Sequence, residues 1–209
     1  RSSWGRAMDI DAIPGLKALW SKTMGDPDIC VAILDGPADR SHPSLAAVHL
    51  TQLETLASDA AGQGPAAIHG THVASIIFGQ HGGPVKGIAP GCRGLILPIF
   101  QDGTDDSIAP CSQVDLARAI TQAVEAGAQV INISGGEYSP SGTAHPLLTD
   151  AVQACAERGV IIIAAAGNEG CECLHIPGAL PAVLAVGAMD AENRPLDFSN
   201  WGPAYRRQD

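Results

Sequence analysis

The fold is decided by a short apolar stretch, ICVAILDG, which occupies residues 29–36. Six apolar residues in succession, 29–34, are expected of a parallel strand that is buried on both of its faces. The turn Asp35-Gly36-Pro37 then ends this strand. A carboxylate therefore lies at the mouth of a buried strand, where a charge is costly unless it is paired or hydrogen-bonded.

Similar apolar runs recur along the chain and alternate with helical patterns. We expect further strands over 93–100, 129–133, 160–166 and 183–188. We expect helices over 10–23, 69–78, 114–125 and 146–158, the third of them capped by Ser112. Strands that alternate with helices through short loops predict right-handed βαβ units. The chain is therefore expected to be an α/β protein with a mostly parallel, doubly wound sheet.

The composition suits one globular domain of 209 residues, with 45% hydrophobic and 16% charged residues. The net charge of −10 argues against a nucleic-acid partner, whose phosphates require a basic face. The longest apolar run, 160–166, is too short to cross a bilayer, so no membrane partner is expected. No signal peptide is visible, which favours a cytoplasmic location. Secretion stays open, because the chain begins at Arg1 rather than at a methionine.

The six cysteines leave two interpretations open. Only two of them lie close together, in the C-x-C segment at 171–173, and none shows the C-x₂₋₄-C spacing of zinc sites. We therefore expect no metal. The cysteines are either buried or free thiols, or they form one or two disulfides. They are Cys30, Cys92, Cys111, Cys155, Cys171 and Cys173.

Polar residues follow three of the predicted strands. Asp35 follows the first, the segment SGG at 134–136 follows the third, and Asn168 comes just after the fourth. In open parallel sheets, ligands bind beyond the carboxyl ends of the strands, so we expect these groups to be neighbours in space. His69, which opens a predicted helix, is a candidate partner for the Asp35 carboxylate.

Each of these signals also has an ordinary explanation. Asp35 could cap a turn, His69 could cap its helix, and Gly167-Asn168 could be a simple turn. His69 and His72 are spaced like two metal ligands, but no carboxylate accompanies them as in H-E-x-x-H. Neither G-x-G-x-x-G nor G-x-x-x-x-G-K-[ST] occurs, which argues against a nucleotide site. No oxygen-rich calcium loop is recognisable.

Four motifs, in the same order along the chain, resemble those of the subtilisin-like serine proteases, or subtilases. VAILDG at 31–36 is similar to the family's aspartate motif. HGTHVAS at 69–75 resembles its histidine motif, whose first histidine is catalytic. VINISGG at 130–136 resembles the strand that lines the substrate channel, and AAAGNEG at 164–170 resembles the oxyanion segment. Together they are a specific signal.

The resemblance continues through PAVLAVGA at 181–188 and FSNWG at 198–202, which are similar to the region just upstream of the family's nucleophilic serine. It therefore covers about residues 29–202. It implies a subtilisin-like, three-layer αβα peptidase domain over 29–209, incomplete at its C-terminus. Residues 1–28 are expected to form an N-terminal extension with a short amphipathic helix.

The resemblance also implies roles for three polar side chains. Asp35 would accept a hydrogen bond from His69 Nδ1, and His69 would be the general base and acid for a serine. Asn168 would donate its side-chain amide to the developing oxyanion. No cofactor or metal is implied, and His72 is expected to serve in packing. The other histidines are expected at ordinary surface or loop positions: His42, His49, His81, His145 and His175.

A peptide substrate is implied on the same grounds. Ser134, Gly135 and Gly136 would bind it as an added strand through backbone hydrogen bonds. The two glycines leave room for the close approach of that strand. Ala165 and Gly167 would belong to the opposite wall of the pocket that takes the residue before the cut.

Two departures from the family pattern matter. The family's serine normally opens a later helix in a G-T-S segment, and this chain ends at Asp209 without one. Ser199 is no substitute, because FSN at 198–200 resembles a region before the nucleophile. Gly36 replaces the usual Ser or Thr, which removes one possible hydrogen-bond donor. We therefore expect the 209-residue chain to be inactive on its own.

Several segments are more particular than the general subtilase motifs. They are IDAIPGL at 10–16, LDGP at 34–37, INISGGE at 131–137, GCECLH at 170–175 and LDFSNWG at 196–202. On these segments, the chain resembles the proteases that mature cyanobactin (patellamide-type) precursor peptides. A precursor peptide is then the expected substrate.

The resemblance leaves three functions to separate. One enzyme of the cyanobactin group cleaves the precursor N-terminal to its core, and its paralogue makes a macrocycle. The macrocyclase carries a helical insertion between its aspartate and histidine. Here only 34 positions (69 − 35) separate Asp35 and His69, too few for that insertion, so hydrolysis is favoured. A non-catalytic peptide-binding scaffold is the third hypothesis, although it would not need Asp35, His69 and Asn168 together.

Overall fold

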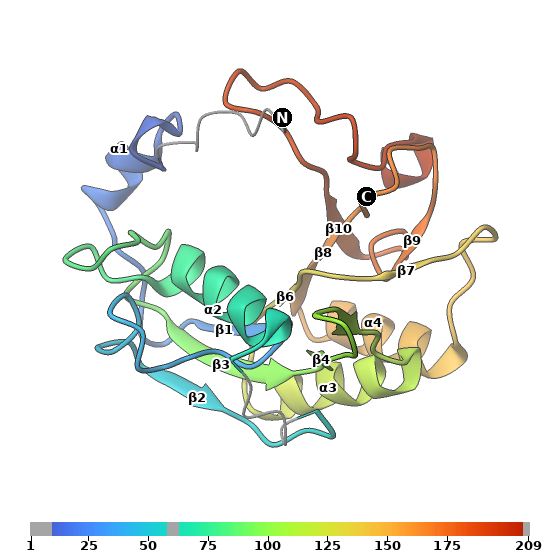
Figure 1. Ribbon diagram of the computed structural model, residues 1–209, viewed down its shortest axis with the longest axis horizontal. Coiled ribbons are helices and arrows are strands. Elements are labelled where there is room, and N and C mark those ends of the chain that lie inside the picture. The colour runs from blue at the N-terminus through green and yellow to red at the C-terminus, as the bar shows by residue number, and fades with distance from the viewer. Residues whose placement is uncertain (1–9, 58–62, 207–209) are drawn as a thin grey trace.

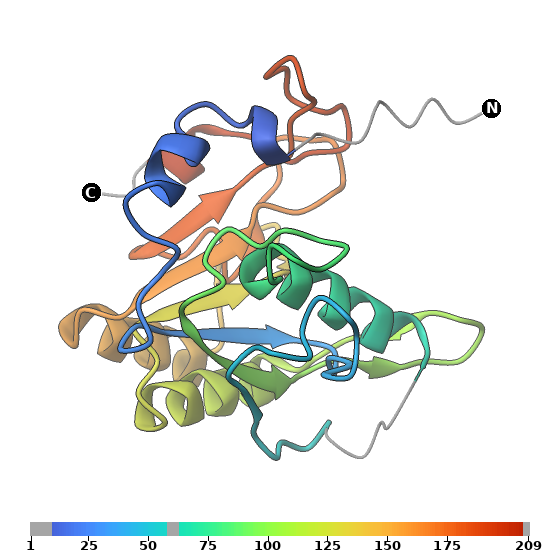
Figure 2. The same ribbon diagram turned by 90° about the vertical axis from the view of Figure 1, so that its left-hand side faces the viewer.

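The computed structural model describes residues 10–57 and 63–206 of the chain. The start of the expected N-terminal extension, residues 1–9, and the last residues, 207–209, lie outside the described part. A parallel sheet forms the middle layer and helices cover both of its faces (Figures 1 and 2). The expected three-layer α/β architecture is therefore confirmed.

The central sheet has six parallel strands in the order β10-β8-β6-β1-β3-β2. Their bounds are β1 Cys30–Asp35, β2 Leu50–Gln52, β3 Arg93–Pro98, β6 Val130–Ile133, β8 Ile161–Ala165 and β10 Val183–Val186. The five predicted strands are present, with ends shifted by only one or two residues. The edge strand β2 was not predicted, because its sequence contains no apolar run. Because all six strands are parallel, their carboxyl ends share one edge of the sheet.

Strand β1 is buried on both faces, as its apolar run predicts. Ala32 and Leu34 pack into the larger core cluster, whereas Ile33 packs on the opposite face with Ala74 and Phe78. All five side chains are 0% exposed. Full burial of a side chain as large as Leu34, Ile33 or Phe78 contributes about 1.5–3 kcal/mol. The packing therefore fixes β1, and with it the position of the residue at its end.

In the part of the chain that the structure describes, three longer helices form the outer layers. Helix α2, Pro65–Phe78, lies on one face of the sheet, and α3, Gln113–Glu125, and α4, Pro146–Glu157, lie on the other (Figures 1 and 2). The Ser112 side chain accepts a hydrogen bond from the backbone N–H of Asp115 at 3.1 Å. The predicted cap of α3 is therefore confirmed.

Two predicted helices have different bounds. The expected helix over 10–23 is divided into a 3-10 turn, η1, at Ile10–Ala12 and a short helix, α1, at Leu16–Trp20. Gly15 has a left-handed φ of 83°, which interrupts the helical path between them. The helix expected from His69 begins one turn earlier, at Pro65. Proline suits the first turn of a helix because it has no N–H to leave unpaired.

In the described residues, two small antiparallel strand pairs lie beyond the carboxyl edge of the sheet. Strand β4, Gln101–Asp102, pairs with β5, Ile108–Ala109, in antiparallel fashion. Strand β7, Glu137–Tyr138, pairs with β9, His175–Ile176, and the two lie side by side in Figure 1. This second pair brings the segment after β8 against the segment after β6.

The outer strands β8 and β10 are covered less completely than β1. Ile161, Leu184 and Val186 are 48, 47 and 55% exposed. The register places Leu184 beside Ile163 and Val186 beside Ala165, so these side chains share one face of the sheet. A final 3-10 turn, η2, spans Pro203–Arg206. No helix within the described ranges has the length and apolar character needed to cross a membrane.

Candidate active site

Asp35 is the last residue of β1, and its side chain is fully buried. Its Oδ1 accepts a hydrogen bond from the backbone N–H of Gly36 at 2.6 Å. Its backbone carbonyl accepts from the N–H groups of Ile99 and Phe100, at 2.7 and 3.2 Å. The backbone around this carboxylate is therefore fixed, but a buried charge also needs a partner for its side chain.

His69 is that partner. Its Nδ1 lies 2.7 Å from Asp35 Oδ1, so the structure brings the two predicted residues together. The His69 side chain is 42% exposed, whereas that of Asp35 is 0% exposed. The carboxylate on the Nδ1 side favours the tautomer with the proton on Nδ1, because this proton completes the hydrogen bond. The Nε2 lone pair is then free to act on a substrate.

The electrostatics of the pair follow from this contact. The hydrogen bond with Asp35 raises the pKa of His69 above its ordinary value of 6.5, while partial burial of the ring opposes the rise. An imidazole whose protonated form is stabilised by a fixed carboxylate can accept a proton and return it. The pair has the geometry of a general base with an orienting aspartate.

Close packing of α2 on the turn after β1 makes this contact possible. A side chain at Gly36 would clash with the backbone carbonyl of Ala66, and one at Gly70 would clash with the carbonyl of Gly36. Gly36 therefore cannot be replaced by the usual Ser or Thr without moving the helix. Within the described residues, the second oxygen of Asp35, Oδ2, has no hydrogen-bond partner. The sequence predicts the loss of one hydrogen-bond donor at Gly36, and the unpaired oxygen agrees with that loss.

The two predicted walls of the substrate pocket follow neighbouring strands. Strands β6 and β8 pair in parallel, with Ile133 opposite Ala164. Ser134 follows β6 directly, and its hydroxyl accepts a hydrogen bond from the Asn132 side chain at 2.8 Å. Ala165 is the last residue of β8. The segments 134–136 and 164–167 therefore leave the same edge of the sheet side by side.

Gly135 and Gly136 face different surroundings. A methyl group placed on Gly135 would lie 2.5 Å from the Phe100 ring, whereas one on Gly136 would lie 2.7 Å from the Ile176 carbonyl. Both glycines also line a cavity of about 580 Å³, which includes Ile99 among its apolar residues. A side chain at either position would therefore clash with a neighbouring group.

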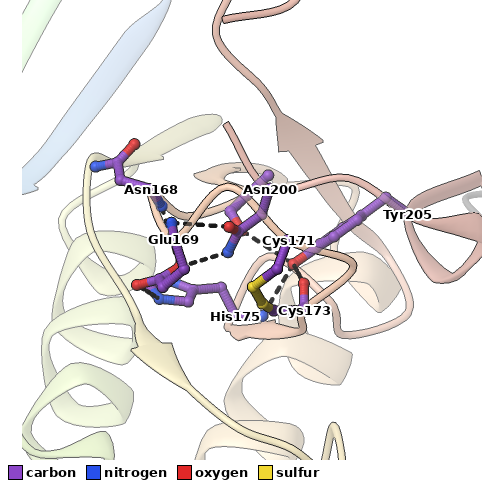
Figure 3. The surroundings of a disulfide bond; sticks show 8 residues. Asn168, Glu169, Cys171, Cys173, His175, Asn200 and Tyr205 are labelled. Carbon is purple, nitrogen blue, oxygen red and sulfur yellow. Dashed lines mark hydrogen bonds and ion pairs between the residues drawn. A yellow bond between two sulfur atoms is a disulfide. The ribbon is translucent and has the colours of Figure 1, made fainter. Parts of the chain in front are cut away.

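Asn168 lies three residues beyond β8, at the same edge of the sheet as Asp35. Its backbone N–H donates to the Glu169 carboxylate at 3.1 Å. Its side chain is exposed and points away from that carboxylate (Figure 3). In the described part of the chain, no hydrogen bond joins this side chain to Asp35 or His69. The structure therefore places Asn168 at the predicted edge, with its amide free for a ligand.

A second ion pair, which the sequence does not predict, lies beneath Asn168. His175 Nε2 is 3.0 Å from Glu169 Oε1, and Glu169 Oε2 accepts from the Asn200 side chain at 2.5 Å (Figure 3). Asn200 also accepts from the backbone N–H of Glu169 at 2.9 Å and donates its own N–H to Gly167 O at 3.0 Å. Asn200 thus holds both sides of the turn that carries Asn168.

The charge of Glu169 is stabilised in this network. Burial alone would raise the pKa of the Glu169 carboxyl, but the hydrogen bond from Asn200 and the charge of His175 outweigh it and lower the pKa below its ordinary value of 4.5. The expectation that His175 is an ordinary surface or loop residue is wrong, because the residue is only 8% exposed. Its nearest groups come from segments distant in sequence, so no local pattern could reveal it.

The segment between Glu169 and His175 is held by two further contacts. Cys171 and Cys173 form a disulfide, which settles the open question for this pair. The Tyr205 hydroxyl accepts from the backbone N–H of His175 at 2.9 Å and lies 2.8 and 3.0 Å from the carbonyls of Cys173 and Ala166 (Figure 3). This polar network joins η2 to both ends of the turn.

The other cysteines are free thiols: Cys30, Cys92 and Cys155 are buried, and Cys111 is half-buried. Burial raises the pKa of the Cys111 thiol to about 11, so it stays protonated and unreactive at neutral pH. In the ranges 10–57 and 63–206, no group of three or more His, Cys, Asp and Glu side chains is placed to hold a metal ion.

Two further residues bear on the predictions from the sequence. His72 is exposed on α2, so the prediction that it serves in packing is wrong. His69, three residues earlier on the same helix, is half-buried. Ser199 is buried, and its hydroxyl accepts a hydrogen bond from the backbone N–H of Ala188 at 2.9 Å. The Ser199 hydroxyl is therefore occupied by a backbone contact.

Comparison with known proteins bears on the same site. The sequence model of a peptidase family, Peptidase_S8, described as the Subtilase family, matches residues 26–208. The major intracellular serine protease of Bacillus subtilis is 32% identical over 209 residues, which is 92% of this chain and 63% of that protein. A thermophilic serine proteinase of Bacillus sp. is 31% identical over 187 residues, 88% of this chain and 44% of that protein. The chain thus spans about half the length of these relatives.

Solved structures show the same likeness, two of them at higher identity. The prenylagaramide maturation protease PagA is 56% identical, with a TM-score of 0.85 over 94% of this chain and 66% of its own. The patellamide maturation protease PatA is 58% identical, with a TM-score of 0.77 over 88% of this chain and 65% of its own. The PatG macrocyclase in complex with peptide is 28% identical, with a TM-score of 0.77 over 95% of this chain and 69% of its own.

Proposed function

The chain belongs to the subtilase family of peptidases, and from this premise we propose that it is the larger part of a serine endopeptidase domain. In this proposal Asp35 and His69 are the orienting acid and the general base, and Asn168 stabilises the oxyanion. The observation that carries the proposal is the 2.7 Å contact between a fully buried carboxylate and a half-exposed imidazole. A structural ion pair has no need to present its imidazole to solvent.

The chemistry follows from this geometry. Asp35 holds the proton on His69 Nδ1, so Nε2 accepts the proton of a serine hydroxyl as the serine oxygen attacks the peptide carbonyl. The Asn168 amide, which is exposed at the same edge of the sheet, donates to the oxyanion that forms. His69 then gives its proton to the departing amine, and the acyl-serine is hydrolysed by water. Ser199 is not proposed as the nucleophile, because its hydroxyl is buried against the backbone.

The substrate in this proposal is a peptide in extended conformation. Ser134, Gly135 and Gly136 bind it as an added strand, and Ala165 and Gly167 face it from the other side. PagA and PatA are maturation proteases, and both are more than half identical to this chain. A ribosomal precursor peptide of the cyanobactin kind is therefore the substrate class that we propose.

Macrocyclisation is the alternative reaction of the same site. The chain also resembles the PatG macrocyclase, but at 28% identity against 56% for PagA. The 34 positions from Asp35 to His69 leave little room for a lid that excludes water from the acyl-enzyme. Mass spectrometry of the product from a precursor peptide separates the two reactions, since the linear acid is heavier than the macrocycle by one water. A cyclic product would contradict hydrolysis.

Labelling with a fluorophosphonate tests the proposed catalytic role of His69. The 209-residue chain is joined to the part of PagA that follows the matched region, which supplies a candidate serine segment. We expect this joined protein to react with the probe and the chain alone not to react. His69→Ala should abolish labelling, whereas the matched variant His72→Ala should not. Equal labelling of the His69→Ala protein, or peptidase activity of the chain alone, would overturn the assignment.

A further inference from the structure

The start of α2, the helix that carries His69, depends on another segment for its cap. The N-cap residue, Gly64, has no side chain to accept a hydrogen bond, and Pro65, the first helical residue, has no N–H. Ala66 therefore provides the first N–H inside the helix, and this residue is only 1% exposed. Because a buried donor without an acceptor is unfavourable, the helix needs an acceptor from outside its own sequence.

Asp102 of strand β4 supplies this acceptor. Its Oδ1 accepts a hydrogen bond from the backbone N–H of Ala66 at 2.8 Å. Strand β4 lies beside the start of α2 (Figures 1 and 2). A methyl group placed on Gly64 would clash with the Asp102 carboxylate, so the carboxylate fits closely against the turn that opens the helix. A negative charge at this end of a helix also interacts favourably with the helix dipole.

The segment that carries Asp102 also contacts the other member of the candidate catalytic pair. The backbone carbonyl of Asp35 accepts from the N–H groups of Ile99 and Phe100, at 2.7 and 3.2 Å. Asp102 follows two residues later. One short segment, 99–102, therefore contacts both the strand end that carries the carboxylate and the helix that carries the imidazole.

We propose that Asp102 is a positioning residue for His69. It fixes the first turn of α2 relative to the end of β1 and so maintains the 2.7 Å contact between His69 Nδ1 and Asp35 Oδ1. The helix requires the oxygen acceptor of Asp102 more than its charge. This inference rests on the proposed function, in which His69 is the general base.

His69 lies close enough to the start of α2 for a lost cap to matter. It is the fifth residue of the helix, and helix ends are where fraying begins. The close packing of Gly36 on the Ala66 carbonyl limits how near the helix can come to β1, whereas the hydrogen bond to Asp102 opposes its moving away. Because a hydrogen bond weakens steeply out of line, a displaced His69 ring would lose its contact with Asp35.

Hydrogen exchange of the unmodified chain tests the cap without any substitution. The Ala66 amide should exchange at least about ten-fold more slowly than in an unstructured peptide of the same sequence, because its N–H is bonded to Asp102. Exchange at the rate of the peptide would contradict the inference, whether or not any variant folds.

Three variants then separate the acceptor from the charge. Asp102→Ala removes both, whereas Asp102→Asn removes the charge and keeps an oxygen that can cap a helix. Asp105→Asn is the matched control, since it removes a charge from an exposed residue of the same hairpin, with a φ of 60° that asparagine tolerates. Amide spectra report whether each variant keeps the fold.

The readout in the chain itself is the NMR signal of the His69 Nδ1 proton, which the hydrogen bond with Asp35 shifts downfield and protects from exchange with water. We expect Asp102→Ala to lose this signal and both asparagine variants to keep it. In the joined protein with a serine segment, Asp102→Ala should slow fluorophosphonate labelling about five-fold, as the loss of a cap predicts. Asp102→Asn and Asp105→Asn should each slow it by less than about two-fold.

The outcomes separate this inference from the proposed function. If folded Asp102→Ala keeps the Nδ1 signal or labels at the unmodified rate, Asp102 does not position His69, although the proposed function stands. Equal losses in Asp102→Ala and Asp102→Asn would show that the charge acts and would overturn the capping role. If the unmodified chain shows no Nδ1 signal, the pair of Asp35 and His69 is not formed, and the proposed function fails together with the inference.

Discussion

Two histidine–carboxylate pairs lie at the same edge of the sheet, and their burial is reversed. In the first, Asp35 is 0% exposed and His69 is 42% exposed. In the second, the side chain of His175 is 10% exposed and that of Glu169 is 42% exposed. The same two chemical groups therefore present opposite partners to solvent. The exposed imidazole can exchange a proton with a substrate, whereas the buried imidazole can only fill space and hold its neighbours.

The largest expected effect tests the chemical role of the first pair. In the joined protein with a serine segment, Asp35→Asn should lower kcat about 10⁴-fold, because His69 loses the partner that fixes its tautomer. Glu169→Gln removes the charge from the second pair and should lower kcat less than about ten-fold. Initial rates on a fluorogenic peptide measure both. Equal losses would mean that the two pairs do not differ in role.

The next largest effect concerns Asn168, the proposed oxyanion residue. Asn168→Ala should lower kcat about 10²–10³-fold with little change in KM, since the amide acts on the oxyanion and not on the bound substrate. Asn200→Ala should give a smaller loss, because Asn200 acts only by holding the turn through Glu169 and Gly167. An increase in KM alone for Asn168→Ala would contradict the assigned role. Asn200→Asp keeps the shape of the side chain but replaces the donor to Glu169 Oε2 with a carboxylate oxygen, so its loss should be at least as large as that of Asn200→Ala.

The first pair could be predicted from the sequence for a physical reason. Asp35 ends an apolar run, and an apolar run both predicts a buried strand and fixes where it stops. His69 lies on a helix that must pack on that strand. Each residue is therefore placed by the element that carries it. Their contact then follows from the parallel sheet. The start of the helix at Pro65 was not predicted.

The second pair could not be predicted in the same way. His175 is buried by Gly136, Gly167 and Tyr205, which come from three separate segments. Its own neighbours in sequence, a C-x-C segment and Ile-Pro, describe a loop and give no sign of burial. The fold of the sheet could be predicted because each of its predicted strands is a continuous apolar run in the sequence. The contacts between loops at the edge of the sheet have no such pattern in the sequence.

A smaller effect concerns the pH dependence of the first pair. Because the pKa of His69 is raised in the folded state, the pair contributes stability that is full below about pH 6.5 and is lost as the pH rises through the folded pKa. NMR titration of the His69 ring should show a midpoint above 6.5 in the native chain. In Asp35→Asn the midpoint should fall. An unchanged midpoint would show that the contact does not hold the imidazolium.

The smallest expected effect has the opposite sign. The pKa of Glu169 is lowered on folding, so its contribution to stability is present above about pH 4.5 and is lost as the pH falls through the folded pKa. Because this carboxylate is 42% exposed, the contribution should be at most about 1 kcal/mol. Urea unfolding of the native chain and Glu169→Gln at neutral and acidic pH measures it. A larger difference at acidic pH than at neutral pH would reverse the expected sign.

The position of β1 in the middle of the sheet has a consequence for synthesis on the ribosome. Its neighbour β3 begins 58 residues (93 − 35) after β1 ends, and β6 begins 95 residues (130 − 35) after it. At about 5–20 residues per second, roughly 5–20 s pass before both neighbours have been made. During that time an apolar strand has no native partner on one or both sides. Nascent chains that end before residue 130 should therefore depend on chaperones to avoid aggregation.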